Sequence, residues 1–182
     1  MLLFVGTYKT GEAIADALFR VFLVDAGFTD REIGLWVSTY GISASLLGSL
    51  FGGVLASRIA IVNAVGVTAI LRSLSLAIEL YAVAFPSPEA VIVATVAQHF
   101  FGGALTAAMF AFMMSVVDRR IGATHYTLLA TVETLGKGLA AWPSGFLQER
   151  WGYVPVYGLA LGLSLAFLGL LLPITRLEKR PA

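Results

Sequence analysis

Four ionisable side chains recur in the first apolar segment, at steps of three, four and four residues: Lys9, Glu12, Asp16 and Arg20. At about 100° per residue, this spacing confines them to one helix stripe roughly 80° wide. A charge at mid-membrane costs about 2.5 to 3.5 kcal/mol, so such side chains need partners, water or neighbouring helices. We expect Lys9 and Glu12 to line a cavity, and Asp16 to carry a proton because burial favours its neutral form. The alternative is that the pairs Lys9–Glu12 and Asp16–Arg20 are locked ion pairs that fix helix packing.

Further polar side chains lie in later apolar segments. Glu133 and Lys137 are one helical turn apart, which fits either contact with a solute or a simple i,i+4 ion pair. His99 has the side-chain type of a proton relay, although a hydrogen-bonded interior histidine is the plainer interpretation. Arg72 and Glu79 share one helix face and are assigned to a packing interface or, less readily, to function.

Small residues form a separate stripe in the second segment, at Gly41, Ser45, Gly48 and Gly52. The pair Gly48 and Gly52 has the G-x-x-x-G spacing that lets two membrane helices approach closely. We interpret this stripe as a packing surface rather than a binding site.

The composition decides which kind of protein must position these residues. The chain has 182 residues, of which 58% are hydrophobic and 13% charged, and its mean hydropathy is +0.87. Soluble domains carry about 25% charged residues, so we predict an all-α membrane protein. The lack of cysteine and the presence of only two histidines argue against a metal site, and we predict no cofactor. A net charge of +1 gives no basic surface for nucleic acid.

Six stretches are long and apolar enough to cross a bilayer as helices, within one transmembrane domain. We place them at about 2–24, 34–56, 59–85, 91–117, 126–147 and 154–174, followed by a cytoplasmic tail at 175–182. Arginine and lysine are more frequent in the 2/3 and 4/5 connections and in the tail than on the opposite side. The positive-inside rule therefore predicts that both termini face the cytoplasm.

An internal repeat follows the second and fifth segments. Gly53 to Arg58 and Gly145 to Arg150 both read G-x-L-x-x-R, about half a chain apart. The two copies divide the six segments into two sets of three. Because three is an odd number of crossings, one set is inverted relative to the other, as in many secondary transporters.

The first copy, with Gly53, Leu55, Ala56 and Arg58, resembles a degraded form of G-x-L-A-D-R-x-G-R-R, the loop motif of the major facilitator superfamily. Ser57 replaces the acidic residue of that motif. Tyr8 to Ala13 resembles the Y-K-x-G-[DE]-A that opens the C-terminal half of AmpG-type muropeptide permeases and of RhtX/FptX siderophore permeases. Gly122 to Leu129 is similar to their A-T-x-Y-x-L-L segment. The resemblance spans nearly the whole chain, but only helices seven to twelve of a twelve-helix fold.

The resemblance implies the C-terminal half of a secondary active permease of the bacterial inner membrane, with muropeptides or siderophores as cargo. No P-loop occurs, so we expect coupling to protons, most simply as symport, through Glu12, Asp16 and Glu133, with Lys9 and Lys137 holding anionic groups of the cargo. The partner is expected to be a missing or separate N-terminal half, or a second copy. The alternatives are a truncated half without activity of its own, which entry into the first helix at Met1 favours, and an intramembrane enzyme. No catalytic motif supports the enzyme.

Overall fold

The computed structural model describes residues 2–178, which form helices and short connections without any β-strand. The predicted tail at 175–182 is therefore helical in its first part, since the last helix continues to Glu178. Residues 179–182 lie outside the described residues. In chain order the elements are α1 (Leu2–Thr7), α2 (Thr10–Asp25), α3 (Asp30–Ile33), η1 (Gly34–Gly41), α4 (Ile42–Arg58), α5 (Ile61–Ala84), α6 (Pro88–Val116), η2 (Arg119–Ile121), α7 (Gly122–Ala141), α8 (Ser144–Trp151) and α9 (Tyr153–Glu178).

Within the fully described part of the chain, three continuous helices are long and apolar enough to cross a membrane: Asp30–Arg58, Ile61–Ala84 and Pro88–Val116. The first of them starts four residues before the predicted segment. Thr29 is the reason, because its hydroxyl accepts from the Glu32 amide at 3.3 Å while the Glu32 carboxylate accepts from the Thr29 amide at 2.9 Å. This reciprocal pair satisfies amide groups that the first helical turn leaves free.

Two of the predicted crossings are interrupted. The first breaks at Tyr8 and Lys9, between Gly6 and Gly11, and glycine in a helix interior is destabilising by about 0.5–1 kcal/mol. The fifth breaks between α7 and α8 at Pro143, whose ring removes an amide donor and clashes with the preceding turn. Each interruption falls within a single predicted stretch, so six stretches of chain still run along the bundle.

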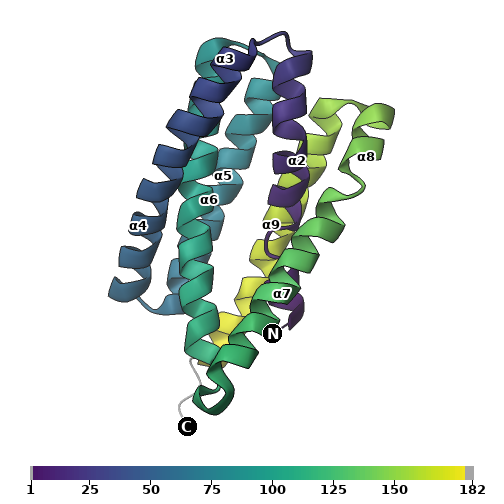
Figure 1. The fold of residues 1–182 in the computed structure, drawn as a ribbon. Helices are drawn as coiled ribbons and strands as arrows, with labels where there is room; N and C mark the ends of the chain where they lie inside the picture. Colours follow the sequence, from purple (N-terminus) through teal and green to yellow (C-terminus); the bar gives the residue numbers. More distant parts are fainter. Residues whose placement is uncertain (1, 179–182) are drawn as a thin grey trace.

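The helices pack side by side in one bundle (Figure 1). α6 lies between α4 and α5, α5 packs against α9, and α2 packs against α9 and α7. The start of α1, the α4–α5 connection and the α6–α7 connection lie at one end of the bundle, and α3 and α8 lie at the other (Figure 1). Consecutive crossings therefore run in opposite directions, as short connections require.

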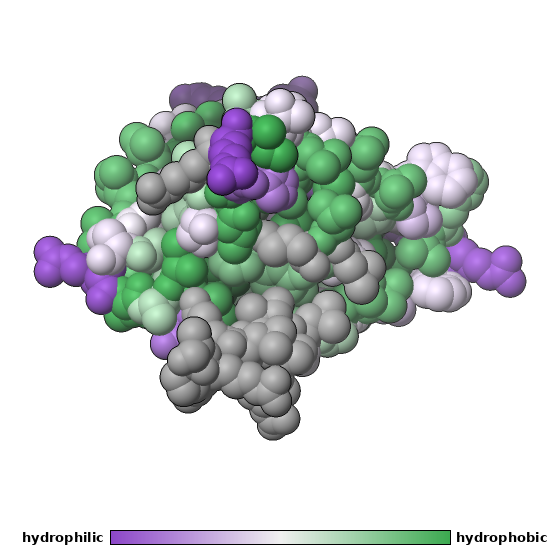
Figure 2. Space-filling view, turned by 90° about the horizontal axis from the view of Figure 1, so that it is seen from below, coloured by the Kyte–Doolittle hydropathy of each residue, from purple (hydrophilic) through white to green (hydrophobic). Residues whose placement is uncertain are grey.

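The outer surface is apolar. Figure 2, an end-on view, shows hydrophobic residues around most of the circumference, with hydrophilic residues at separate points. Leu139 is 74% exposed, Trp142 76% and Leu46 64%, and such side chains recur along α4, α5 and α7. Exposed apolar area on this scale is typical of a surface covered by lipid or by another protein.

Inside the bundle, two apolar clusters are separated along the helices by polar side chains. One cluster, around Phe22, Trp36 and Tyr157, lies towards the end with α3. The other, around Phe112 and Phe167, lies towards the opposite end. On α6, for example, Val91 belongs to the first cluster and Leu105 to the second, and the buried polar residues Thr95 and Gln98 fall between them. The polar groups are therefore placed at mid-height in the bundle.

Candidate functional site

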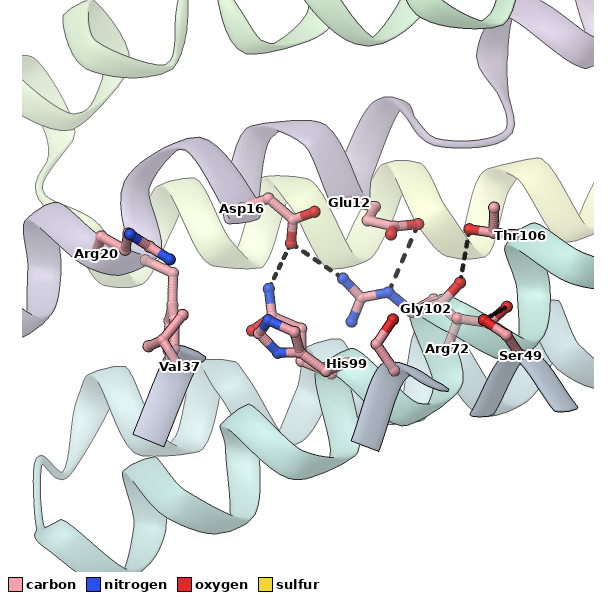
Figure 3. A pocket seen from close by; sticks show the side chains of 13 residues that line it. Glu12, Asp16, Arg20, Val37, Ser49, Arg72, His99, Gly102 and Thr106 are labelled. Atoms are coloured by element: carbon pink, nitrogen blue, oxygen red, sulfur yellow. Dashed lines mark hydrogen bonds and ion pairs between the residues drawn. The ribbon is translucent and has the colours of Figure 1, made fainter. Parts of the chain in front are cut away.

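Arg72 on α5 is the centre of the buried polar layer, with 1% of its surface exposed. Its Nη1 donates to Glu79 Oε1 at 2.9 Å and to Ser75 Oγ at 2.7 Å. Its Nη2 lies 3.3 Å from Asp16 Oδ1, and its Nε lies 3.6 Å from Glu12 Oε2. One guanidinium therefore contacts three carboxylates on two helices, two of them drawn in Figure 3.

Helical spacing on α2 and α5 places these groups. Glu12 and Asp16 are one turn apart on α2, so both carboxylates reach the same face. Arg72 and Glu79 are two turns apart on α5, with Ser75 between them. Glu79 has no exposed surface, and a buried carboxylate of this kind is costly unless it is paired. Arg72 supplies that partner.

A pocket of about 350 Å³ opens beside this cluster. Thirteen residues from α2, η1, α4, α5 and α6 line it: Glu12, Asp16, Phe19, Arg20, Val37, Ser45, Ser49, Arg72, Gln98, His99, Gly102, Gly103 and Thr106. Its volume lies within the range of about 300–1,000 Å³ typical of small-molecule sites. A charged pocket thus lies among helices whose outer faces are apolar.

Two side chains of α6 border the Asp16 side of the pocket. The Gln98 amide nitrogen donates to Asp16 Oδ1, whereas Gln98 Oε1 has no hydrogen-bond partner among the described side chains although Gln98 is only 6% exposed. The Nδ1 of His99 lies 2.9 Å from the Thr95 carbonyl oxygen, and the ring rests against Gly41. His99 therefore faces the pocket from a position that its own helix and Gly41 hold.

Lys9 and Glu133 form a second buried polar contact, between the start of α2 and α7. Lys9 Nζ lies 3.4 Å from Glu133 Oε1 and donates to Thr106 Oγ1 at 2.8 Å. The Tyr8 hydroxyl donates to the same Glu133 oxygen at 2.8 Å. Because Thr106 also lines the pocket, this contact lies directly behind the pocket wall.

The ion pairs thus differ from those that sequence spacing suggests. The proposed Lys9–Glu12 and Asp16–Arg20 pairs are replaced by pairs that join different helices. An i,i+4 spacing brings two side chains to one face, but a neighbouring helix can offer a closer partner. Arg20 lies beyond Asp16 at the edge of the pocket and has no ion pair within residues 2–178 (Figure 3).

The remaining predicted residues lie away from the pocket. Lys137 is exposed on α7, one residue beyond Gly136, the residue that packs against Gly6, and it forms no ion pair with Glu133 among the residues described. The loop motif ends α4 on the surface, where Gly53 and Arg58 are exposed and Leu55 and Ala56 are half-buried.

The small-residue stripe faces α6. A Cβ on Gly48 would overlap the Phe100 carbonyl oxygen, and one on Gly52 would overlap that of Ala104. In the reverse direction, a Cβ on Gly103 would meet the Ser45 carbonyl. Gly41 instead makes room for the His99 ring. The backbones of α4 and α6 therefore touch directly, as small residues permit.

Sequence reasoning gave too little weight to Arg72 and Glu79 and left Gln98 and Thr106 unassigned. For Arg72 and Glu79 the sequence did give an indication of function, since both lie on one face of a strongly apolar segment. An intramembrane ionisable residue is by default a candidate for function. Gln98 and Thr106 gave no such signal, because uncharged polar residues are common in membrane helices.

Comparison with known proteins gives these features a family context. No family model matches the chain. Over 174 residues, 94% of its length, the chain is 28% identical to the anhydromuropeptide permease of Escherichia coli K12. Over 84% of its length it is 27% identical to putative transporter AmpG 4 of Rickettsia conorii, and over 97% it is 25% identical to the AmpG 4 protein of Rickettsia felis. The homologues of this chain are AmpG permeases.

The AmpG names are those of permeases and transporters rather than enzymes. Together with the apolar helices, they indicate a multi-pass membrane protein that is similar to part of known transporters. The chain spans only 35% of the Escherichia coli relative, 37% of the Rickettsia conorii relative and 43% of the Rickettsia felis relative. It therefore corresponds to less than half of each.

Proposed function

We propose that this chain forms half of a proton-coupled AmpG-like permease of the bacterial inner membrane, with the Arg72 pocket as one wall of its solute pathway. The observation that carries the proposal is that three carboxylates from two helices meet one buried guanidinium beside an open pocket. Charged groups at mid-height in a membrane bundle are costly, and they characteristically mark solute and proton pathways. The Asp16 side chain remains 44% exposed, so protons and solute can reach it from the pocket.

Within this proposal, Glu12 and Asp16 carry protons, and Glu133 is a third acidic group in contact with Lys9. A proton on a carboxylate weakens its ion pair with Arg72 or Lys9, and the freed cation then seeks another partner. This exchange can link protonation to a change in helix packing. Lys137 is exposed on α7 and does not line the Arg72 pocket, so its proposed contact with the cargo would be made outside this pocket.

The proposal includes two three-helix repeats of opposite orientation within a major facilitator fold, and cytoplasmic termini. In support, the G-x-L-x-x-R copies lie at the end of α4 and within α8, at opposite ends of the bundle (Figure 1). Arg58 and Arg120 lie at the end where α1 begins, and Arg31 and Arg150 lie near the other end. The loop motif of Gly53, Leu55, Ala56 and Arg58 is then cytoplasmic.

A second wall then lies outside these 182 residues, because the polar pocket belongs to a bundle less than half as long as its relatives, and a missing N-terminal half is one source of it. A separate N-terminal half or a second copy can supply it. The competing function is a half-transporter without activity of its own. The Escherichia coli relative is named for anhydromuropeptides, so this cargo is tested first and siderophores second.

The experiment is uptake of radiolabelled anhydromuropeptide into proteoliposomes with an imposed pH gradient. The chain is reconstituted alone and together with the N-terminal half of the Escherichia coli relative. We expect gradient-driven uptake in at least one arrangement, and its loss in Glu12→Gln and Asp16→Asn. Glu149→Gln, on an exposed carboxylate of α8, is the matched control.

Uptake with unchanged pH dependence in both variants would reject the proton-carrier roles. A stable monomer by native mass spectrometry, folded but inactive in both arrangements, would favour the inactive half-transporter. Siderophore uptake without muropeptide uptake would leave the permease proposal intact and change its cargo.

A further inference from the structure

We propose that the Arg72 pocket binds a primary ammonium group carried by a polar solute, with Glu12, Asp16 and Gln98 as its acceptors. This inference rests on the proposed transport function and adds the chemical class of the group that the pocket recognises. Four observations carry it: the charge balance of the polar layer, an unpartnered buried amide oxygen, the orientation of the pocket hydroxyls, and the pocket volume.

The polar layer has an excess of negative charge. Two cationic side chains, Lys9 and Arg72, face four carboxylates: Glu12, Asp16, Glu79 and Glu133. Arg20, at the edge of the pocket, is a third cation, so one negative charge is uncompensated when all seven side chains are ionised. Glu79 has no exposed surface and Glu133 is 6% exposed, so neither is accessible to a solute in the pocket. The carboxylates available to an added cation are Glu12 and Asp16, which both line the pocket.

The hydrogen-bonding capacity that remains in the pocket is mainly that of acceptors. Gln98 is 94% buried, lines the pocket and has no partner for Oε1. Asp16 uses Oδ1 to accept from Gln98 and Arg72, and Oδ2 makes no hydrogen bond within residues 2–178. Among the described side chains, Glu12 Oε2 has a 3.6 Å ion pair with Arg72 Nε and no hydrogen bond, and Arg72 Nε is the one buried donor of the pocket that is likewise without a hydrogen bond there. An unpaired buried acceptor costs about 1–3 kcal/mol, which a donor from the solute can recover.

Two of the three hydroxyl groups that line the pocket, those of Ser49 and Thr106, strengthen this preference for donors. Ser49 Oγ donates to the Gly103 carbonyl at 3.4 Å, and Thr106 Oγ1 donates to the Gly102 carbonyl at 2.8 Å. Both protons are therefore directed to the backbone, so the lone pairs are what these oxygens can offer to the pocket. The cationic edge of the pocket is separate, since Arg20 lies beyond Asp16 (Figure 3).

Pocket size distinguishes an organic cation from a bare ion. A water molecule occupies about 30 Å³ of liquid, so a pocket of about 350 Å³ holds far more than one alkali ion. A primary ammonium group presents three donors on a tetrahedral nitrogen. These match the three acceptors at Glu12, Asp16 and Gln98, and the rest of the solute has room in the remaining volume.

The test compares two probes that differ in one charge. Alanyl-alaninamide carries an ammonium group and no carboxylate, and its N-acetylated form is neutral and otherwise the same. The purified full chain in detergent is titrated with each, and saturable protection against thermal unfolding is measured. We expect protection by the amine alone, and at least about tenfold weaker binding to Asp16→Asn and Glu12→Gln.

Gln98→Leu removes the unpartnered oxygen without changing a charge and is expected to weaken binding severalfold. Glu149→Gln is again the control and should bind as the parent does. Circular dichroism and elution as a single species establish that each variant is folded. Where a carboxylate variant does not fold, the amine-against-amide comparison on the parent chain and on Gln98→Leu decides the matter.

Equal binding of the acetylated probe would overturn the inference, as would amine binding that is unchanged in every folded pocket variant. Equal protection by sodium or potassium chloride at the same concentration would replace it with an alkali-ion site. These failures leave the transport proposal standing whenever pH-driven uptake is observed. If the parent chain binds the ammonium probe but shows no uptake in either arrangement, the transport proposal is rejected and the ammonium site is retained.

Discussion

The α4–α6 interface and the polar layer around Arg72 lie side by side, yet they are built on opposite principles. At the interface, glycines bring two backbones into contact and leave no room for a side chain. In the polar layer, long charged side chains keep α2, α5 and α6 apart and leave a pocket. Backbone contact fixes one arrangement, whereas ion pairs can exchange partners. From this comparison we expect α4–α6 to be the rigid part of the bundle, and we propose the polar layer as the part that responds to protons or solute.

The largest effect should follow loss of the central cation in the polar layer. Arg72→Met leaves three carboxylates without their shared partner, and breaking a buried pair in this way costs about 3–5 kcal/mol. We expect a marked fall in the unfolding midpoint in dodecyl maltoside. Adding Glu79→Gln should restore part of the loss, because it removes the most deeply buried unpaired charge. No recovery in the double variant would show that Arg72 acts through packing alone.

The rigid interface is tested by Gly48→Ala on α4. The new Cβ would overlap the Phe100 carbonyl oxygen, so the helices must separate, at a cost of about 1–3 kcal/mol. Gly53→Ala on the same helix meets nothing within 4 Å and should be neutral or stabilising by about 0.5–1 kcal/mol. The two unfolding midpoints, measured together, check this contrast. Equal midpoints would mean that α4 and α6 can separate without cost.

A comparable effect is expected from Lys9→Met, which removes one partner of Glu133 and leaves the Tyr8 hydroxyl in place. The loss should be about 1–3 kcal/mol. In a double-mutant cycle with Glu133→Gln, we expect a coupling energy of at least about 0.5 kcal/mol. Lys137→Met is the matched control and should change stability by less than about 0.5 kcal/mol, because Lys137 is exposed. A coupling energy between Glu133 and Lys137, and none between Glu133 and Lys9, would contradict this pairing and favour the i,i+4 ion pair.

The smallest effect on stability should come from Gly102→Ala. A Cβ there would lie 3.2 Å from Glu12 Oε1 and 3.6 Å from Arg72 Nε. Crowding of the carboxylate opposes the gain in helix propensity of about 1 kcal/mol, so the net change should stay within about 1 kcal/mol. Affinity for the ammonium probe should fall all the same, because the Glu12 carboxylate has to move. Unchanged affinity would remove Glu12 from the binding site.

Much of the fold could be predicted from the sequence because bilayer thickness and hydropathy constrain helices strongly. The predicted stretches correspond in order to the helices of the bundle, and the stripe of Lys9, Glu12 and Asp16 does turn inwards. The start of the second stretch was misplaced because the capping pair of Thr29 and Glu32 was not used. The break at Lys9 was also missed, because mean hydropathy does not respond to a local change in the backbone.

Hydropathy and periodicity by themselves determined that this is a helical membrane protein, and motif resemblance pointed to its likeness to AmpG-type permeases. They also determined which residue types stand at mid-membrane height. Only the tertiary structure decided the partners, since Arg72 meets Asp16 across 56 residues and Lys9 meets Thr106 across 97. The physical reason is that helical spacing places a charge on a face, whereas its partner depends on which helix packs against that face and at what height. The sequence alone is compatible with several sets of ion pairs among these charged side chains, and helix packing selects one of them.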